Sequence, residues 1–172
     1  MSATIPETWG PPRQKTITWY DPLATAAAGA ELDGRAFMEA IRDGQLAPPP
    51  IAMVFDFAIA EIGDGTVTFE VTPDESAYNP IGMVHGGLVC TLLDTVTGCA
   101  VQTQLPAGTG YAHIDLQVSY LRPVRLETGR LSARGWVTKP GRRVAFAQGE
   151  VVDPAGKLLA TATASLAIMA AT

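Results

Sequence analysis

The sequence predicts an α+β domain in which an antiparallel β-sheet wraps around one long helix, with a helical extension at the N-terminus. The first observation is residues 85–103, a helix-like stretch that is apolar on nearly every side and must therefore be covered. The second is a set of alternating apolar and polar segments on both sides of that stretch, which are typical of strands. The third is size and composition, because 172 residues, 47% hydrophobic and 17% charged, suit one globular domain with an added arm.

The extension is expected to cover residues 1–47 and the main domain residues 48–172. Residues 1–22 are rich in Pro, Trp and Thr and show no period, so we expect an extended arm there. Its aromatic side chains are candidates for packing on a partner: Trp9, Trp19 and Tyr20. Residues 24–43 are expected to form one amphipathic helix that ends at Gly44.

The strands are expected in two groups around the central helix. Residues 54–62 and 66–72 form a hairpin across a Gly-Asp-Gly turn, and residues 73–84 form a loop that leads into the helix. After the helix, an antiparallel meander is expected from residues 111–121, 128–138, 142–152 and 157–169.

Charge and composition exclude several functional classes. The formal net charge is −5 and no long basic run occurs, which argues against nucleic-acid binding. No signal peptide and no run of about 18 apolar residues is apparent, so we expect a cytoplasmic protein without a membrane span. Cys90 and Cys99 lie nine residues apart, roughly 13 Å along one helix, so they are expected to be reduced core thiols. A catalytic cysteine is the weaker alternative because neither has an evident activating neighbour.

The start of the central helix is the main candidate site. Gly86 follows His85 at the helix N-terminus, where free backbone N–H groups and a positive dipole end can polarise a carbonyl. Asn79, six residues earlier, could donate a second hydrogen bond or hold His85, although the pair Asn79-Pro80 taken alone favours a simple turn former. His85 and the two glycines could likewise serve only the helix start.

Asp94 places a carboxylate inside the apolar run, where an ionised group needs a partner or a use. It could pair with a basic side chain or act in catalysis. His85 and Asp94 are nine residues apart, about two and a half turns, so they point to opposite sides of one helix. If both act on one substrate, Asp94 must come from a second subunit, with two helices antiparallel across a two-fold axis and two sites per dimer.

These residues carry a family resemblance. Asn79-x5-His85-Gly86-Gly87-x6-Asp94, followed by Asp115-x4-Tyr120-Leu121-Arg122-Pro123, resembles the hotdog-fold PaaI-type acyl-CoA thioesterases, relatives of the 4-hydroxybenzoyl-CoA thioesterases, over residues 50–168. The resemblance implies a hotdog fold that dimerises edge to edge and often forms a homotetramer. It also implies hydrolysis of an acyl-CoA without a metal or other cofactor, since coenzyme A is part of the substrate.

The resemblance assigns roles residue by residue. The Gly86 N–H would polarise the thioester carbonyl, and Asn79 and His85 would assist at the carbonyl and the departing sulfur. Asp94 of the neighbouring chain would be the general base or the nucleophile. Relatives commonly carry Ser or Thr where this chain has His113, so His113 could hold water, act as a second base or only pack.

The coenzyme A phosphates need cations, which the resemblance places at Arg122 and at the turn Gly141-Arg142-Arg143, with Lys139 as a possible addition. A solvated turn is the alternative for that segment. The acyl group would be aryl or medium-chain. A non-catalytic acyl-CoA-binding module is the competing hypothesis, and a hydratase or dehydratase on the same fold is a weaker one. Two histidines without a ligand cluster disfavour a zinc enzyme, and the lack of G-x-S-x-G disfavours a serine hydrolase.

Overall fold

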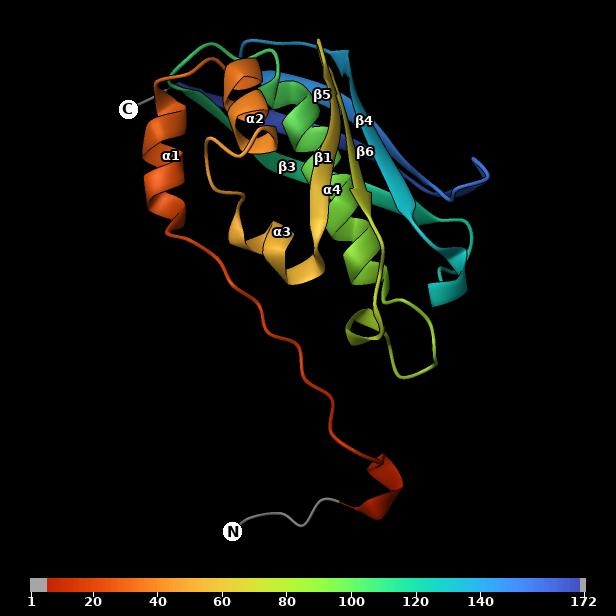
Figure 1. The fold of residues 1–172 in the computed structure, drawn as a ribbon. Coiled ribbons are helices and arrows are strands. Elements are labelled where there is room, and N and C mark those ends of the chain that lie inside the picture. Colours follow the sequence, from red (N-terminus) through yellow and green to blue (C-terminus); the bar gives the residue numbers. More distant parts are fainter. Residues whose placement is uncertain (1–5, 171–172) are drawn as a thin grey trace.

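The computed structural model describes residues 6–170 and confirms the α+β class (Figure 1). One six-stranded antiparallel sheet, in the order β1-β2-β4-β5-β6-β3, wraps the long helix α4. The strands are β1 Phe57–Gly63, β2 Thr66–Val71, β3 Thr109–Tyr120, β4 Leu131–Lys139, β5 Val144–Val152 and β6 Leu158–Ala170. The helices are α1 Pro22–Ala30, α2 Gly34–Arg42, α3 Pro50–Phe55 and α4 Gly86–Gln102, with short 3-10 turns at Glu7–Trp9, Glu75–Ala77 and Leu126–Thr128.

Helix α4 packs closely on the sheet along one face. The side chains of Leu92, Leu93 and Val96 are fully buried there. Gly135 of β4 lies directly under the helix, and a Cβ at that position would come within 2.1 Å of the Val96 carbonyl oxygen. The glycine therefore sets how closely the helix can approach the sheet.

The opposite face of α4 is not covered, which corrects the expectation that the helix is buried all round. Gly87, Thr91 and Thr95 are only partly buried, and the side chain of Asp94 is 55% exposed. From one turn to the next these residues are three or four positions apart, so they lie on one face of α4 and form a stripe along it. Asp94 therefore does not lie in the core of this chain.

The position of β3 corrects the predicted meander. Strands β4, β5 and β6 follow one another as expected, but β3 lies at the sheet edge beside β6, from Thr109↔Ala170 to Tyr120↔Ala160. Alternation identifies a strand but not its neighbour, because any strand with the right face can extend the sheet. In the described chain β3 and β1 are therefore the two edges of the sheet.

The N-terminal helix is also corrected, since α1 and α2 replace the single helix expected over residues 24–43. The first helix ends at Ala30, and Asp33 caps the second, because its side chain accepts from Ala36 N at 2.8 Å. Gly34 then packs on the end of α4, where a Cβ would lie 1.7 Å from the Gln102 carbonyl oxygen. The predicted hairpin is confirmed over β1 and β2, but its first residues belong to α3, which ends at Asp56 in a left-handed conformation.

The arm is extended and runs outside the body of the domain (Figure 1). Ion pairs hold it at Arg13–Glu75, 3.0 Å, and Lys15–Asp74, 2.7 Å. Its aromatic side chains Trp9, Trp19 and Tyr20 are 73%, 58% and 65% exposed. Their packing on a partner stays a prediction, and the first five residues of the arm lie outside the described residues. Within the described part of the chain, no helix combines the length and apolarity that crossing a membrane requires.

Candidate active site

Asn79 shapes the loop that leads into α4. Its side-chain carbonyl oxygen accepts from Ile81 N and Met83 N, both at 3.1 Å, so Asn79 does form the turn that the sequence suggested as one alternative. The His85 N–H donates to the Ala77 carbonyl at 2.7 Å and anchors the end of the loop. The Asn79 amide nitrogen is left as a donor, because only the oxygen serves the turn.

His85 caps helix α4 with its ring. Its Nδ1 accepts from the Gly87 N–H at 2.8 Å, so the ring carries its proton on Nε2. The side chain of His85 is exposed, which leaves that Nε2–H free to donate to a ligand. The N–H of Gly86 precedes the capped amide and has no acceptor among the described residues. Two hydrogen-bond donors therefore stand together at the positive end of the helix dipole.

A cavity of about 280 Å³ opens beside this helix start. Asn79, Gly86 and Arg122 all line it, so the structure brings together three of the residues that the sequence singled out. Tyr120 closes one wall: its ring carbons lie 3.2 Å from where a Gly86 Cβ would be, and its hydroxyl donates to the Gly86 carbonyl at 3.0 Å. Arg122 is exposed and donates to the Leu158 carbonyl.

Asp94 lies eight residues further along α4, about 12 Å from Gly86 along the axis. Its Oδ1 lies 3.2 Å from Nδ1 of His113 in β3. Asp94 therefore has a basic side chain beside it, which was one of the two alternatives for this carboxylate. The other ring nitrogen of His113 lies 3.1 Å from the hydroxyl of Thr97, one turn along α4. Thr97 was not singled out from the sequence, although its spacing from Asp94 on the same helix could have indicated it.

A β-bulge positions His113. The register of β3 on β6 shifts between His113 and Asp115, so Ile114 is the extra residue and its side chain is 58% exposed. Bulges often redirect side chains beside functional sites. Asp115 itself accepts a hydrogen bond from Ser165 of β6. The His113 side chain, only 17% exposed, is thereby directed at α4.

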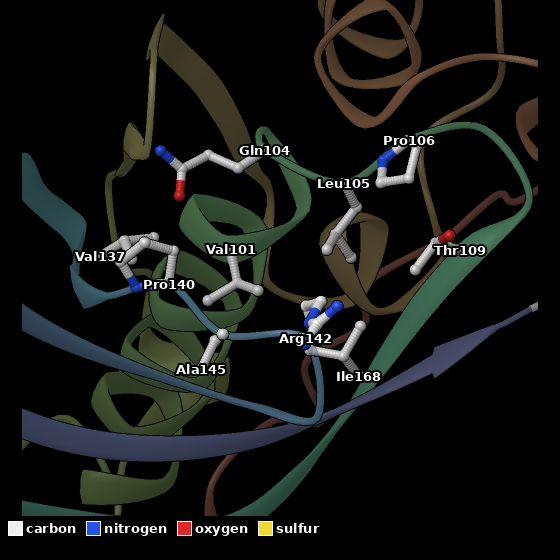
Figure 2. A pocket seen from close by; sticks show the side chains of 11 residues that line it. Val101, Gln104, Leu105, Pro106, Thr109, Val137, Pro140, Arg142, Ala145 and Ile168 are labelled. Carbon is white, nitrogen blue, oxygen red and sulfur yellow. The ribbon is translucent and has the colours of Figure 1, made fainter.

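A larger cavity, about 540 Å³, lies at the other end of α4 (Figure 2). Its walls are mostly apolar, and Arg142 is its charged residue. The lining comprises Val101, Gln104, Leu105, Pro106, Thr109, Val137, Pro140, Gly141, Arg142, Ala145 and Ile168. The structure thus separates the predicted coenzyme A residues, since Arg122 belongs to the first cavity and Gly141 and Arg142 to the second. Arg143 and Lys139 are exposed and line neither.

Both cysteines are free thiols. Desolvation by burial raises the pKa of Cys99 to about 12, so its nucleophilic thiolate form is scarce at neutral pH. Burial also raises the pKa of Tyr111, its hydrogen-bond partner, well above the ordinary value. Among the described residues, no three His, Cys, Asp or Glu side chains are grouped so that they could hold a metal ion.

Known proteins share the sequence and the fold. The family model of the thioesterase superfamily matches residues 81–160. A Halobacterium salinarum protein described as an esterase is 39% identical over 57% of this chain, which covers 66% of that relative. Human acyl-coenzyme A thioesterase 13 is 31% identical over 56% of this chain and 68% of its own length.

A crystal structure from Ralstonia eutropha, named as a thioesterase and phenylacetic acid degradation-related protein, superposes with a TM-score of 0.70. It is 30% identical, and the match covers 76% of this chain and 98% of that one. The fold, the motif around Gly86 and these relatives all indicate the same family. The chain belongs to the thioesterase superfamily and is a hotdog-fold thioester hydrolase of the PaaI type.

Proposed function

We propose that this protein hydrolyses an acyl-CoA to the free acid and coenzyme A, at a site that two subunits share. The observation that carries the proposal is the helix start, where Asn79 and Gly86 face one cavity while Asp94 lies about 12 Å away on the uncovered face of α4. The name of the human relative, acyl-coenzyme A thioesterase 13, supports the substrate class.

At the helix start the substrate carbonyl binds the Gly86 N–H. The helix dipole and the N–H stabilise the negative charge that develops on the carbonyl oxygen. The Asn79 amide nitrogen is a second donor to that oxygen, and the turn made by its carbonyl oxygen holds it in place. The His85 Nε2–H donates to the departing sulfur, because Nδ1 is engaged by Gly87.

Asp94 acts on a substrate bound to the other subunit. The stripe of Gly87, Thr91, Asp94 and Thr95 is open to a second α4, and the outer edge of β3 is open to a second β3. Two α4 helices packed antiparallel across a two-fold axis would carry each Asp94 toward the other chain's Gly86. In that position Asp94 serves as general base or as nucleophile at the thioester carbon. A dimer is the smallest assembly that meets this requirement, and the tetramer and the cytoplasmic location stay predictions.

The same antiparallel arrangement brings the larger cavity of one subunit toward the helix start of the other. Its apolar wall suits the acyl chain or the pantetheine arm, for an aryl or medium-chain acid. Arg142 in the lining of this cavity and Arg122 at the first cavity suit the phosphates of coenzyme A, and Arg143 and Lys139 add positive charge to the turn.

Thiol release from a panel of aryl-CoA and medium-chain acyl-CoA esters tests this function. Wild type is expected to release coenzyme A, and Asp94→Asn is expected to lose at least about a hundredfold in rate while it still binds the ester. Binding of an ester without release by wild type would instead indicate an acyl-CoA-binding module. Water addition to an enoyl-CoA without thiol release would indicate a hydratase.

A further inference from the structure

The hydroxyl of Thr97 fixes the proton on one nitrogen of His113. Thr97 is fully buried, and its Oγ1 donates to the Leu93 carbonyl at 2.7 Å, with the Asp94 carbonyl 3.2 Å away. A threonine hydroxyl has a single hydrogen, and this one is directed at the helix backbone. Toward His113 Nε2, at 3.1 Å, Thr97 can therefore only accept, so Nε2 carries a hydrogen.

That assignment leaves Nδ1 of His113 facing a carboxylate. Nδ1 lies 3.2 Å from Asp94 Oδ1, which is within ion-pair distance. In a neutral ring with its hydrogen on Nε2, Nδ1 has only a lone pair, and a carboxylate oxygen also has only lone pairs. The contact is attractive only when one further proton lies between the two groups, either as imidazolium with carboxylate or as imidazole with carboxylic acid.

The other titratable groups around His113 do not supply or accept that proton. Tyr111 of β3 packs edge-on against the imidazole, with ring centroids 6.0 Å apart, and hydrogen-bonds to Cys99 of α4. The raised pKa of the thiol, about 12, and that of the phenol keep both neutral below pH 9. From β6, the register partner of His113 is Leu166, which is apolar and fully buried.

We propose that Asp94 and His113 of one subunit hold a single proton between them, and that loss of this proton makes Asp94 the general base of the reaction. The inference rests on the function proposed above and selects the base role over the nucleophile. His113 is a positioning residue, because it acts through Asp94 and not on the substrate.

The protons taken up and released by the pair balance over one catalytic cycle. The deprotonated pair takes a proton from water as the water oxygen forms a bond to the thioester carbon. The carbon–sulfur bond then breaks, and the proton held by Asp94 and His113 passes to the sulfur to give the coenzyme A thiol. The acid product releases its own proton to solvent, and the pair is again deprotonated.

The rate–pH profile of full-length variants on an acyl-CoA tests the role of the pair. Wild type is active only once the shared proton has left, so kcat/KM falls on the acidic side. Thr97→Val removes the hydroxyl that forces the hydrogen onto Nε2, so His113 can donate from Nδ1 to Asp94 without an extra proton. The acidic limb is expected to move to lower pH in Thr97→Val and in His113→Gln, because both changes let the side chain at position 113 donate to Asp94 without an extra proton. Thr97→Ser keeps the hydroxyl and is expected to retain the wild-type profile, whereas superimposable profiles for all four proteins would overturn the proposal.

Nitrogen-15 NMR of the imidazole gives a readout that needs no activity. The chain has two histidines, so His113→Gln assigns both sets of ring signals. In wild type we expect both His113 nitrogens to carry hydrogen at low pH and only Nε2 to carry it after deprotonation. A neutral ring protonated at Nδ1 would refute the pairing even if thiol release is observed. The expected tautomer without thiol release would refute the proposed function alone.

Discussion

His85 and Gly87 form a cap in which the imidazole Nδ1 accepts the Gly87 N–H at 2.8 Å. One contact therefore does two things: it satisfies the second free amide of α4, and it fixes the hydrogen of His85 on Nε2. Helix stability and the proposed donor to sulfur are thus coupled in one side chain, and substitutions can separate them.

Substitutions at His85 are expected to separate the cap from the donor. His85→Asn keeps a good N-cap oxygen but shortens the side chain, so the free energy of unfolding should stay close to wild type while kcat falls. His85→Ala loses both, and we expect about 1 kcal/mol less stability together with the same fall in kcat. Urea denaturation and thiol release measure the two effects. Equal stability of the two variants would show that the cap contributes nothing.

Asn79 offers a similar separation on the approach loop. Asn79→Asp keeps the oxygen that accepts from Ile81 and Met83 and removes the amide donor. We expect kcat to fall about a hundredfold or more without a change in melting temperature. Asn79→Ala should lower both kcat and the melting temperature. Full activity in Asn79→Asp would confine Asn79 to its turn.

Arg142 and Arg143 are a matched pair for coenzyme A recognition. Arg142 lines the larger cavity and Arg143 does not, although they are neighbours with the same charge. Arg142→Ala is expected to raise KM for an acyl-CoA at low salt several-fold more than Arg143→Ala, with kcat unchanged. Steady-state kinetics at two salt concentrations test this. Equal increases in KM for the two variants would indicate that the positive charge of the turn acts at long range and that Arg142 makes no specific contact with coenzyme A.

Gly135 is expected to be intolerant of a side chain. A Cβ there would lie 2.1 Å from the Val96 carbonyl oxygen, whereas a Cβ at Gly149 would lie 3.2 Å from side-chain atoms that can shift. Gly135→Ala should therefore lower the free energy of unfolding by about 2 kcal/mol or more, and Gly149→Ala by less. Urea denaturation of both variants checks the order, and the reverse order would contradict the packing of α4 on β4.

The arm should respond to acid through Asp74. The hydrogen bond from Lys15, followed by that from Ser76, lowers the pKa of Asp74 to about 2. A depressed carboxyl pKa stabilises the folded chain above the unfolded value near 4, and that contribution is lost as the pH falls through 2. Carbon-13 NMR of the Asp74 carboxyl should give a midpoint near pH 2, which Lys15→Met moves upward. An unchanged midpoint in Lys15→Met would show that the ion pair is not formed.

The sequence predicts the individual helices and strands of this fold better than it predicts how they are arranged in space. Periodicity predicts α4 and the hairpin, because each buries its own face. It does not predict that β3 pairs with β6, since strand order depends on contacts distant in the sequence. The start of α2 could be predicted in principle, because Asp33 is a favoured N-cap residue, but the apolar stripe continues across it.

For the candidate site too, the sequence predicts the local motif but not the contact between distant elements. The motif at Gly86 is local, so its spacing already indicates a helix start with free donors. The contact between Asp94 and His113 joins α4 to β3 and depends on a β-bulge, which alternation does not reveal. The exposure of Asp94 was missed because its neighbours in sequence are apolar, although the helix presents it on the uncovered face.

Subunit complementation tests the shared site most directly. Asp94→Ala lacks the base, and Gly86→Pro lacks the donor N–H at a helix position that accepts proline, so each homodimer should be inactive. After exchange at equal amounts, half of the dimers are mixed and each regains one intact site, which predicts about a quarter of the wild-type rate. Mixed dimers that form, as native mass spectrometry can verify, and remain inactive would contradict a site built from two chains.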